Sequence, residues 1–388
     1  MGRGLTGLLV PLPMAGERCR AFVPNPVPPE PPLVLDDDLL NLLARANLAL
    51  GRLDGLTAVL PDPGVFLYTY IRKEAVLSSQ IEGTQSSLSD LLLFENEAAP
   101  GVPLNDVQEV SNYVAAMQHG LKRVRGGFPV SLRLLKEIHA VLLTKGRGSE
   151  KEPGEFRRSQ NWIGGTRPGN AAFVPPPADH VAECWGALEK FLHDDKVRLP
   201  VLVKAALAHV QFETIHPFLD GNGRVGRLLI TFLLCTEGAL HEPTLYLSLY
   251  LKQNRARYYE LLQAVRKDGD WEEWLRFFLE GVEQTATQAA STARRLMALA
   301  SKDAQRIQEI GRAAGTALRV HQLLQAQPIV SIPVAAERLK LSFPAVNTGL
   351  GHLVKLGIGR ELTGKTRGRL FAYDAALKLL NEGMEPLK

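Results

Sequence analysis

The sequence predicts a mainly α-helical protein that ends in a winged helix-turn-helix domain. From Asp36 onward, apolar residues recur at helical spacing through most of the 388 residues. From about Gly315 the pattern changes to short helices, followed by two short strands around a basic turn. Helix, turn, helix and basic hairpin is the outline of a winged helix-turn-helix. A chain of this length is expected to hold two or three domains.

Composition excludes a membrane protein and indicates a reducing environment. Hydrophobic residues make up 45% of the chain, yet no apolar run reaches the ~18 residues of a membrane span. The first residues lack a signal-peptide pattern. Three widely spaced cysteines, Cys19, Cys184 and Cys235, favour a reducing compartment, and we expect a cytoplasmic location. The net charge is +4, and residues 310–388 carry 11 Lys and Arg against 5 Asp and Glu.

The first elements can be assigned in chain order. Residues 1–39, with the stretch PNPVPPEPPL, are expected to form an extended arm. An acidic first turn in DDDLLNLLARANLALGRLDGL predicts a helix from Asp36. The apolar stripe of VFLYTYIRKEAVLSSQIEG predicts a second helix, which ends at Gly83.

Further helices follow, with one interruption. The segments DVQEVSNYVAAMQHGLKRV, SLRLLKEIHAVLL, VAECWGALEKFLH and VLVKAALAHVQFETI all have helical periodicity. Between them, residues 156–177 contain Gly-Gly, Pro-Gly and a triple proline, which predict a β-hairpin with a rigid exit. A long helix up to Ile310, in which apolar residues become less frequent, is expected to connect the domains.

The stretch ETIHPFLDGNGRVGRLLI, from Glu213 to Ile230, concentrates the chemistry of the chain. Its glycines allow a tight turn, and the apolar residues after them predict a helix that begins at this turn. The first N–H groups of a helix are free and favour an anion. Arginine side chains at helical spacing suit phosphate oxygens. No Gly-Lys-Ser/Thr sequence is present, so this is not a P-loop.

Each polar residue of this stretch has a candidate role. His216 can exchange a proton near neutral pH, and Asp220 is a hard oxygen ligand suited to Mg²⁺ beside a polyphosphate. Asn222 can donate its amide to a phosphate oxygen. Together with Arg224 and Arg227, these residues fit a hydroxyl that attacks a nucleotide phosphate.

The same stretch resembles the signature of the Fic family, and every signature position is filled. Members of this family typically transfer AMP from ATP to a hydroxyl group of a target protein. The resemblance implies that His216 is the general base and that Asp220 holds Mg²⁺. It implies nucleotide-binding roles for Phe218, Gly221, Asn222, Gly223, Arg224 and Arg227, with Phe218 packed inward to fix the loop.

A second motif, SSQIEGT, resembles the inhibitory-helix motif of the same family. Ser78 and Glu82 are four residues apart and therefore share a helix face. The resemblance implies that Glu82 pairs with Arg227 and thereby displaces the γ-phosphate of ATP. In some relatives the same glutamate helps to remove AMP, so that second role stays open.

Two further segments resemble family features. The predicted hairpin at 156–177 is similar to the flap that aligns an extended target segment, and such strand addition needs only backbone contacts. RYYELL is similar to the helix beside the adenine, where Tyr258 or Tyr259 could stack on the base; core packing is the alternative. The basic hairpin with Lys365, Arg367 and Arg369 could contact DNA phosphates or dock a protein.

The sequence therefore predicts a mainly α protein with a Fic-type helical bundle, a β-hairpin flap and a C-terminal winged helix-turn-helix domain. We expect a protein adenylyltransferase restrained by Glu82, with ATP and a target protein, itself included, as partners and Mg²⁺ as cofactor. A homodimer and DNA are further candidate partners. The alternatives are a Fic enzyme that uses another nucleotide or removes AMP, and a DNA-binding regulator that senses nucleotide. The expected segments are the arm (1–39), N-terminal helices with the inhibitory helix (40–110), Fic domain (111–282), helical connector (283–314) and winged helix (315–388).

Overall fold

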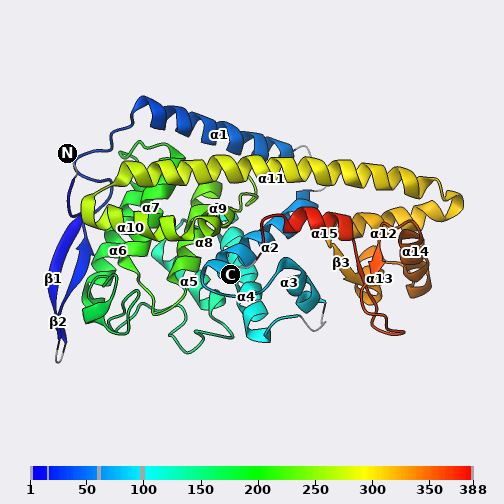
Figure 1. The fold of residues 1–388 in the computed structure, drawn as a ribbon, viewed down its shortest axis with the longest axis horizontal. Coiled ribbons are helices and arrows are strands. Elements are labelled where there is room, and N and C mark those ends of the chain that lie inside the picture. Colours follow the sequence, from blue (N-terminus) through cyan, green and yellow to red (C-terminus); the bar gives the residue numbers. More distant parts are fainter. Residues whose placement is uncertain (1–2, 15–16, 59–62, 97–100, 386–388) are drawn as a thin grey trace.

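The computed structural model describes residues 3–14, 17–58, 63–96 and 101–385, and most of them are helical (Figure 1). The predicted mainly α fold is confirmed. No described helix is both long enough and apolar enough to cross a membrane.

One helix of 38 residues, α11 (Trp271–Gln308), runs along most of the length of the molecule (Figure 1). The N-terminal helix α1 (Asp37–Ala58) lies along it (Figure 1). The predicted connector was expected to begin at residue 283, but α11 passes through this position without a break. The helical bundle and the C-terminal part of the chain are therefore joined by continuous helix.

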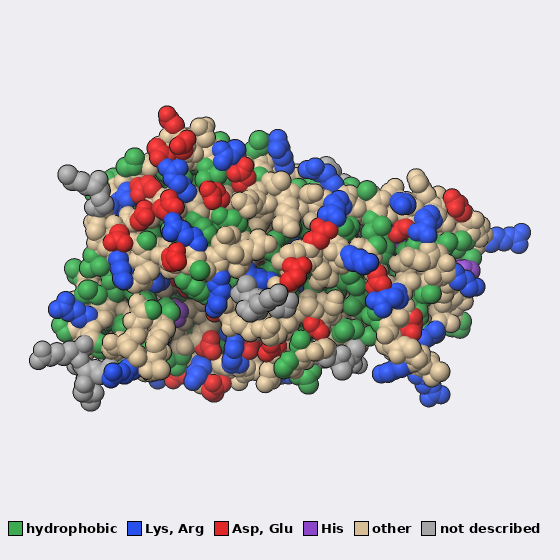
Figure 2. Space-filling model, in the orientation of Figure 1, with side chains coloured by type: hydrophobic (Ala, Val, Ile, Leu, Met, Phe, Trp, Pro, Cys, Tyr) green, Lys and Arg blue, Asp and Glu red, His purple; other side chains and the backbone are tan. Residues whose placement is uncertain are grey.

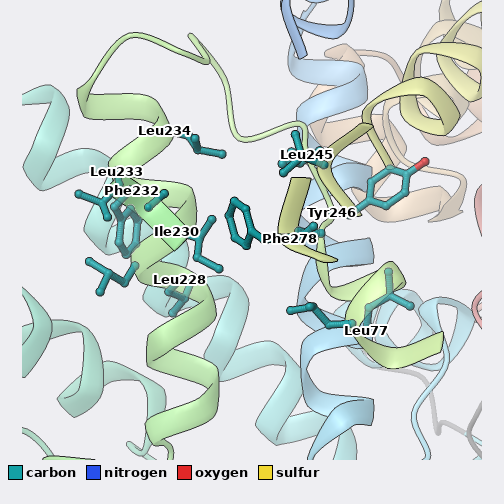
Figure 3. Close-up of a cluster of buried hydrophobic side chains, with 14 of the residues drawn as sticks. Leu77, Leu228, Ile230, Phe232, Leu233, Leu234, Leu245, Tyr246 and Phe278 are labelled. Atoms are coloured by element: carbon teal, nitrogen blue, oxygen red, sulfur yellow. The ribbon is translucent and has the colours of Figure 1, made fainter. Parts of the chain in front are cut away.

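The core lies beneath α11 and is built around the helix α7 (Val201–Ile215). Every residue of α7 from Ala205 to Ile215 is buried, as expected for a helix that is surrounded by others. Figure 3 shows apolar side chains of α8 (Asn222–Thr236), among them Ile230 and Leu234, in one cluster with residues of neighbouring elements. The surrounding helices are α2 (Pro63–Ile81), α3 (Leu88–Glu95), α4 (Leu104–Arg125), α5 (Leu132–Leu142), α6 (Val181–His193), α9 (Ser248–Gln253) and α10 (Arg255–Asp268).

The expected extended arm at 1–39 is wrong for its first part. Strands β1 (Gly7–Met14) and β2 (Glu17–Pro24) form an antiparallel hairpin, with Gly7 opposite Pro24. Pro11 and Pro13 are compatible with this strand because alternate residues direct their backbone N–H positions to the same side. At these two residues that side is the outer edge of the hairpin, where no N–H is needed for pairing. The stretch PNPVPPEPPL begins at the end of the hairpin and leads without regular structure to α1.

The predicted β-hairpin over residues 156–177 is also corrected. It is reduced to a single antiparallel bridge between Ile163 and Phe173, around a 3-10 turn at Pro168–Asn170. The Asn170 carboxamide oxygen accepts hydrogen bonds from the backbone N–H groups of Thr166 and Arg167, both at 3.0 Å. This side-chain cap and the three prolines after the bridge use or remove the donors that a longer ladder would need.

The C-terminal elements follow the predicted order. They are α12 (Ala314–Ala326), β3 (Ile329–Ser331), α13 (Ile332–Leu339), α14 (Phe343–Lys355), β4 (Arg360–Glu361) and β5 (Leu370–Ala372). The three strands form one antiparallel sheet in the order β3-β5-β4. Basic side chains gather at this end of the molecule (Figure 2), with Lys365 and Arg367 exposed in the turn before β5. The winged-helix assignment stays a prediction, and the last helix, α15 (Asp374–Asn381), was not predicted.

Close packing of α4 on α8 can be tested with a matched pair of glycines. A Cβ atom added at Gly120 in α4 would lie 2.3 Å from the buried ring of Phe232, whereas nothing lies within 4 Å of one added at Gly186 in α6. We expect Gly120→Ala to lower the free energy of unfolding by about 1–3 kcal/mol through overpacking. Gly186→Ala should raise it by up to about 1 kcal/mol, because alanine favours helix. Urea denaturation measures both, and equal stabilities would contradict the packing.

Candidate active site

The candidate site is the loop between α7 and α8, and its backbone has two left-handed residues. His216 follows the last residue of α7 with φ of 49°, and Gly221 precedes α8 with φ of 75°. Glycine adopts this conformation freely, but a histidine does so at a cost of about 1–3 kcal/mol and typically at functional positions. The loop thus reverses the chain and directs the first N–H groups of α8 into the space beside His216.

Buried contacts fix this loop on the side that faces the core. Phe218 is fully buried and stacks on the ring of His139, with 3.8 Å between the ring centroids. His139 accepts a hydrogen bond from the Gly154 backbone N–H at Nδ1, so its Nε2 carries the proton that is donated to the Asp220 carbonyl. The inward packing of Phe218 is confirmed. The role of His139 as a support for the loop could not be inferred from sequence spacing.

Asn222, predicted to donate its amide to a phosphate, has a side chain whose partners lie within the loop. Its carboxamide oxygen accepts from the Phe218 N–H at 2.9 Å, and its NH₂ donates to the Phe218 carbonyl at 2.8 Å. The side chain is buried and both of its ends are used. Asn222 therefore holds the loop closed, and its backbone N–H at the helix start is what it can offer to an anion.

The space above the loop is a cavity of about 260 Å³. It brings together residues that are predicted to act on one ligand and two that were not predicted, Arg147 and Leu219. Its walls are Glu82, Arg147, His216, Leu219, Asp220, Gly221, Asn222, Gly223 and Arg224. A helix N-terminus with arginines beside it suits an anionic ligand such as a polyphosphate.

The expected contact between Arg227 and the α2 motif is present. Arg227 donates from Nε to the Ser78 hydroxyl at 2.7 Å, and from Nη2 to the Ser78 carbonyl at 3.0 Å and to Glu82 Oε1 at 2.6 Å. Burial by itself would raise the pKa of Glu82, but Arg227 holds that pKa below its usual value, so the carboxylate is ionised. A Cβ atom added at Gly223 would lie 2.4 Å from Glu82 Oε1, so a glycine is needed there for this approach.

Arg224 is paired with carboxylates on both sides. Its guanidinium lies 3.3 Å from Glu109 and 3.4 Å from Asp220, and it is almost fully buried. Glu109 comes from α4 and also pairs with Arg147 at 3.2 Å. Burial raises the pKa of Glu109, while both arginines oppose this shift. No motif marks Glu109 in the sequence, because it lies more than a hundred residues before the loop.

The environment of His216 keeps its imidazole neutral. Burial, together with the positive charges of Arg266 and Arg157, lowers the pKa of His216 to about 3. Arg157 also donates from Nε to the His216 carbonyl at 2.9 Å, which fixes the backbone. The buried Nδ1 atom has no hydrogen-bond partner among the described residues. A neutral ring beside the cavity can accept a proton.

Tyr258, one of two tyrosines predicted to stack on a nucleotide base, lies in the core. The side chain is 1% exposed, and its hydroxyl lies 2.8 Å from Nε2 of the buried His209. Core packing, the alternative reading, applies to Tyr258. Tyr259, which is 40% exposed, remains the aromatic side chain of RYYELL that a base could reach.

Asp220 fits the expected magnesium ligand. Its carboxylate is about one-third exposed at the edge of the cavity, and its Oδ1 accepts from the Gly221 N–H. The described residues contain no group of three or more His, Cys, Asp or Glu side chains that could hold a metal ion. Mg²⁺ is often bound by one carboxylate together with substrate phosphates and water, so Asp220 alone is a suitable protein ligand.

Comparison with known proteins identifies the family. Residues 40–122 match the Fic/DOC family N-terminal model, and residues 129–234 match the Fic/DOC family model. The chain is 34% identical over 209 residues to "Protein adenylyltransferase Fic" of Aedes aegypti, and 33% identical over 209 residues to the Culex quinquefasciatus protein of the same name. Each match covers 53% of this chain and 39% of the relative, so the chain spans well under half the length of these proteins.

Solved structures agree on the fold. A Fic family protein from Desulfovibrio desulfuricans superposes with a TM-score of 0.58 at 20% identity, over 88% of this chain and 97% of that one. Fic-1 (aa134–508) of C. elegans gives 0.50 at 21% identity, over 66% and 74%. With both models matched in order and the loop signature complete, the chain contains a Fic/DOC family N-terminal region at residues 40–122 and a Fic/DOC family domain at residues 129–234.

Proposed function

We propose that this chain is a protein adenylyltransferase that transfers AMP from ATP to a hydroxyl group of a target protein and is restrained by Glu82. The observation that carries the proposal is the pairing of Arg227 with Ser78 and Glu82, next to the cavity that holds His216 and the start of α8. The relatives named "Protein adenylyltransferase Fic" support the choice of reaction.

The reaction assigns a step to each part of the site. His216, neutral in this environment, takes the proton of the incoming hydroxyl. The hydroxyl oxygen then bonds to the α-phosphorus of ATP while the bond to the β-phosphate breaks, so AMP is transferred and pyrophosphate leaves. Arg224 and the first N–H groups of α8 stabilise the charge on the phosphates. Asp220 would hold Mg²⁺, which supplies further charge neutralisation when bound.

Restraint follows from competition for one guanidinium. With Glu82 on Arg227, the donors on this side of the guanidinium are used by Glu82 and Ser78. A γ-phosphate would have to displace Glu82 or lie elsewhere, and a displaced triphosphate would not align its α-phosphorus with the attacking oxygen. The restrained enzyme can therefore bind nucleotide without efficient transfer.

Glu82→Gly should raise AMP transfer by about tenfold to a hundredfold. This corresponds to about 1.5–3 kcal/mol for a charge-assisted hydrogen bond that no longer competes with the phosphate. The measurement is intact mass after incubation with Mg²⁺ and α-labelled ATP. Glu95→Gly is the matched control, because Glu95 pairs with Arg72 of the same helix α2 but lies outside the cavity.

The double variant Glu82→Gly, His216→Ala should lose the adduct. An adduct that persists without His216 would contradict the general-base role. An unchanged transfer rate in Glu82→Gly would contradict restraint by Glu82 but would not contradict the proposed reaction. Nucleotide binding, followed by calorimetry, shows that the variants are folded.

Asp220→Asn should lower Mg²⁺-dependent transfer in the Glu82→Gly background by at least about a hundredfold, because a carboxylate charge at the metal is worth several kcal/mol. Asp54→Asn is the control: Asp54 binds His241 on the surface and lies away from the loop. Transfer rates across a Mg²⁺ titration separate weaker metal binding from a damaged fold. Wild-type turnover in Asp220→Asn would contradict the proposal that Asp220 binds Mg²⁺.

Histidine titration by NMR should separate His216 from an exposed histidine. The lowered pKa of about 3 means that His216 remains neutral and unchanged from pH 8 to pH 5. The carboxylate of Asp54 raises the pKa of His241 above its usual value, so His241 should gain its proton above pH 6.5. Below pH 6.5 the unfolded chain binds more protons at His216 than the native chain, so this residue should weaken stability as pH falls. A His216 midpoint near 6.5 would contradict the buried, neutral base.

A further inference from the structure

A second cavity, of about 550 Å³, lies between the C-terminal elements and the inhibitory helix. It shares no lining residue with the cavity beside His216. Its walls come from α2, α11, α12 and α15, which meet in the right half of Figure 1. The volume is within the range of about 300–1,000 Å³ that small-molecule sites occupy.

The lining of this cavity selects an uncharged ligand. Its walls are mainly apolar, with Phe66 of α2, Leu296 of α11 and Leu318 of α12 among them. None of the lining residues is Asp, Glu, Lys or Arg. A charged ligand would lose its hydration here without gaining a partner, which is costly.

A buried polar network gives one wall a defined hydrogen-bonding pattern. The Tyr373 hydroxyl donates to Asp303 Oδ2 at 2.7 Å, so its oxygen accepts from His321 Nε2 at 3.3 Å. His321 Nδ1 then accepts from the Gln325 NH₂ at 3.2 Å. Burial lowers the pKa of His321, which agrees with a neutral ring. The network leaves the carboxamide oxygen of Gln325 as an acceptor on the cavity wall.

We propose that this cavity binds an uncharged small molecule with an apolar, ring-sized body and an N–H or O–H donor for Gln325. We further propose that such a ligand strengthens the docking of the C-terminal elements on α2. The occupant would bridge helices from both parts of the chain, and a ligand that binds only the docked arrangement stabilises it.

The coupling to α2 passes through Leu380. The side chain of Leu380 lines the cavity, and its carbonyl accepts from Lys73 Nζ at 3.0 Å. Lys73 is fully buried on α2 and also donates to the Glu382 carbonyl at 3.2 Å. Besides the Tyr246 ring, 4.5 Å from Nζ, these carbonyls are the partners of the buried ammonium group, so they hold residues 380–382 against α2.

About two turns further along α2, residues at the same end of the chain also reach the inhibitory motif. Gln80 donates from its NH₂ to the Met384 carbonyl at 3.3 Å, and Gln80 lies two residues before Glu82. Ligand binding that tightens this contact keeps Glu82 on Arg227. The resulting inhibition of AMP transfer rests on the proposed function, whereas binding and the tightening of α2 do not.

The test uses the full chain and N-phenyl-1-naphthylamine, an uncharged aromatic amine with one N–H donor that fluoresces in apolar surroundings. We expect a saturable increase in fluorescence at one dye per chain. Ala300→Phe on α11 fills the cavity and should weaken dye binding at least tenfold. Ala298→Phe is the matched control, because it adds the same bulk to the same helix at an exposed position outside the cavity. Ala304→Phe is a second filling variant, should Ala300→Phe lose its helical circular dichroism.

Hydrogen exchange of α2 measures the coupling without ATP. Saturating dye should slow amide exchange at residues 73–82 in the wild-type chain at least threefold, and should leave Ala300→Phe unchanged. Non-saturable binding, or binding that both filling variants retain, would overturn the site. Saturable binding with unchanged α2 exchange would overturn the coupling. Failure of AMP transfer would alter neither readout, so the two proposals can be told apart.

Discussion

The buried guanidinium of Arg227 is the charge on which the arrangement of α2 and the loop depends. An arginine cannot lose its proton, and a buried positive charge without a partner costs several kcal/mol. In this structure the partner is Glu82, supported by the hydroxyl and carbonyl of Ser78. Since both residues lie at the end of α2, well over a hundred residues before the loop, Arg227 ties the N-terminal helices to the loop between α7 and α8. Any other partner must supply a comparable negative charge at the same place.

The loop itself is held by groups that do not face the cavity. Asn222 closes it on Phe218, His139 binds the Asp220 carbonyl, and Arg157 binds the His216 carbonyl. These contacts maintain His216 in a left-handed conformation that the residue would not adopt freely. The side chain of His216 therefore stands beside the cavity without a partner of its own at Nδ1. In the proposed reaction, a neutral side chain held in this way needs no reorganisation before it accepts a proton.

The sequence predicted what depends on local spacing. Neighbouring residues were enough to predict that a helix stops before Gly83 and that another begins after Gly221. They were also enough to predict the shared face of Ser78 and Glu82 and the burial of Phe218. What the sequence did not predict concerns partners that are distant in the chain or that compete locally. Asn222 binds its own loop, and Tyr258 binds His209, because a buried polar group takes whichever partner the fold brings to it. Glu109, His139 and Arg157 were missed for the same reason. The β1–β2 hairpin was missed because prolines at alternate positions are tolerated on an edge strand.

In the proposed mechanism Glu82 and a phosphate compete for Arg227, so docking of α2 and productive binding of nucleotide are linked equilibria. If docking of α2 weakens productive nucleotide binding by some factor, productive nucleotide must weaken the docking of α2 by the same factor. The row of buried polar side chains on α2 sets how strong this docking is. Lys73 binds the carbonyls of the chain end, and Glu74 accepts from the Ser248 hydroxyl. Burial raises the pKa of Glu74 to about 7, although Ser248 and Arg227 oppose the shift. A helix held at so many buried polar points moves as a unit, so a group that loosens one end of α2 also loosens Glu82 at the other.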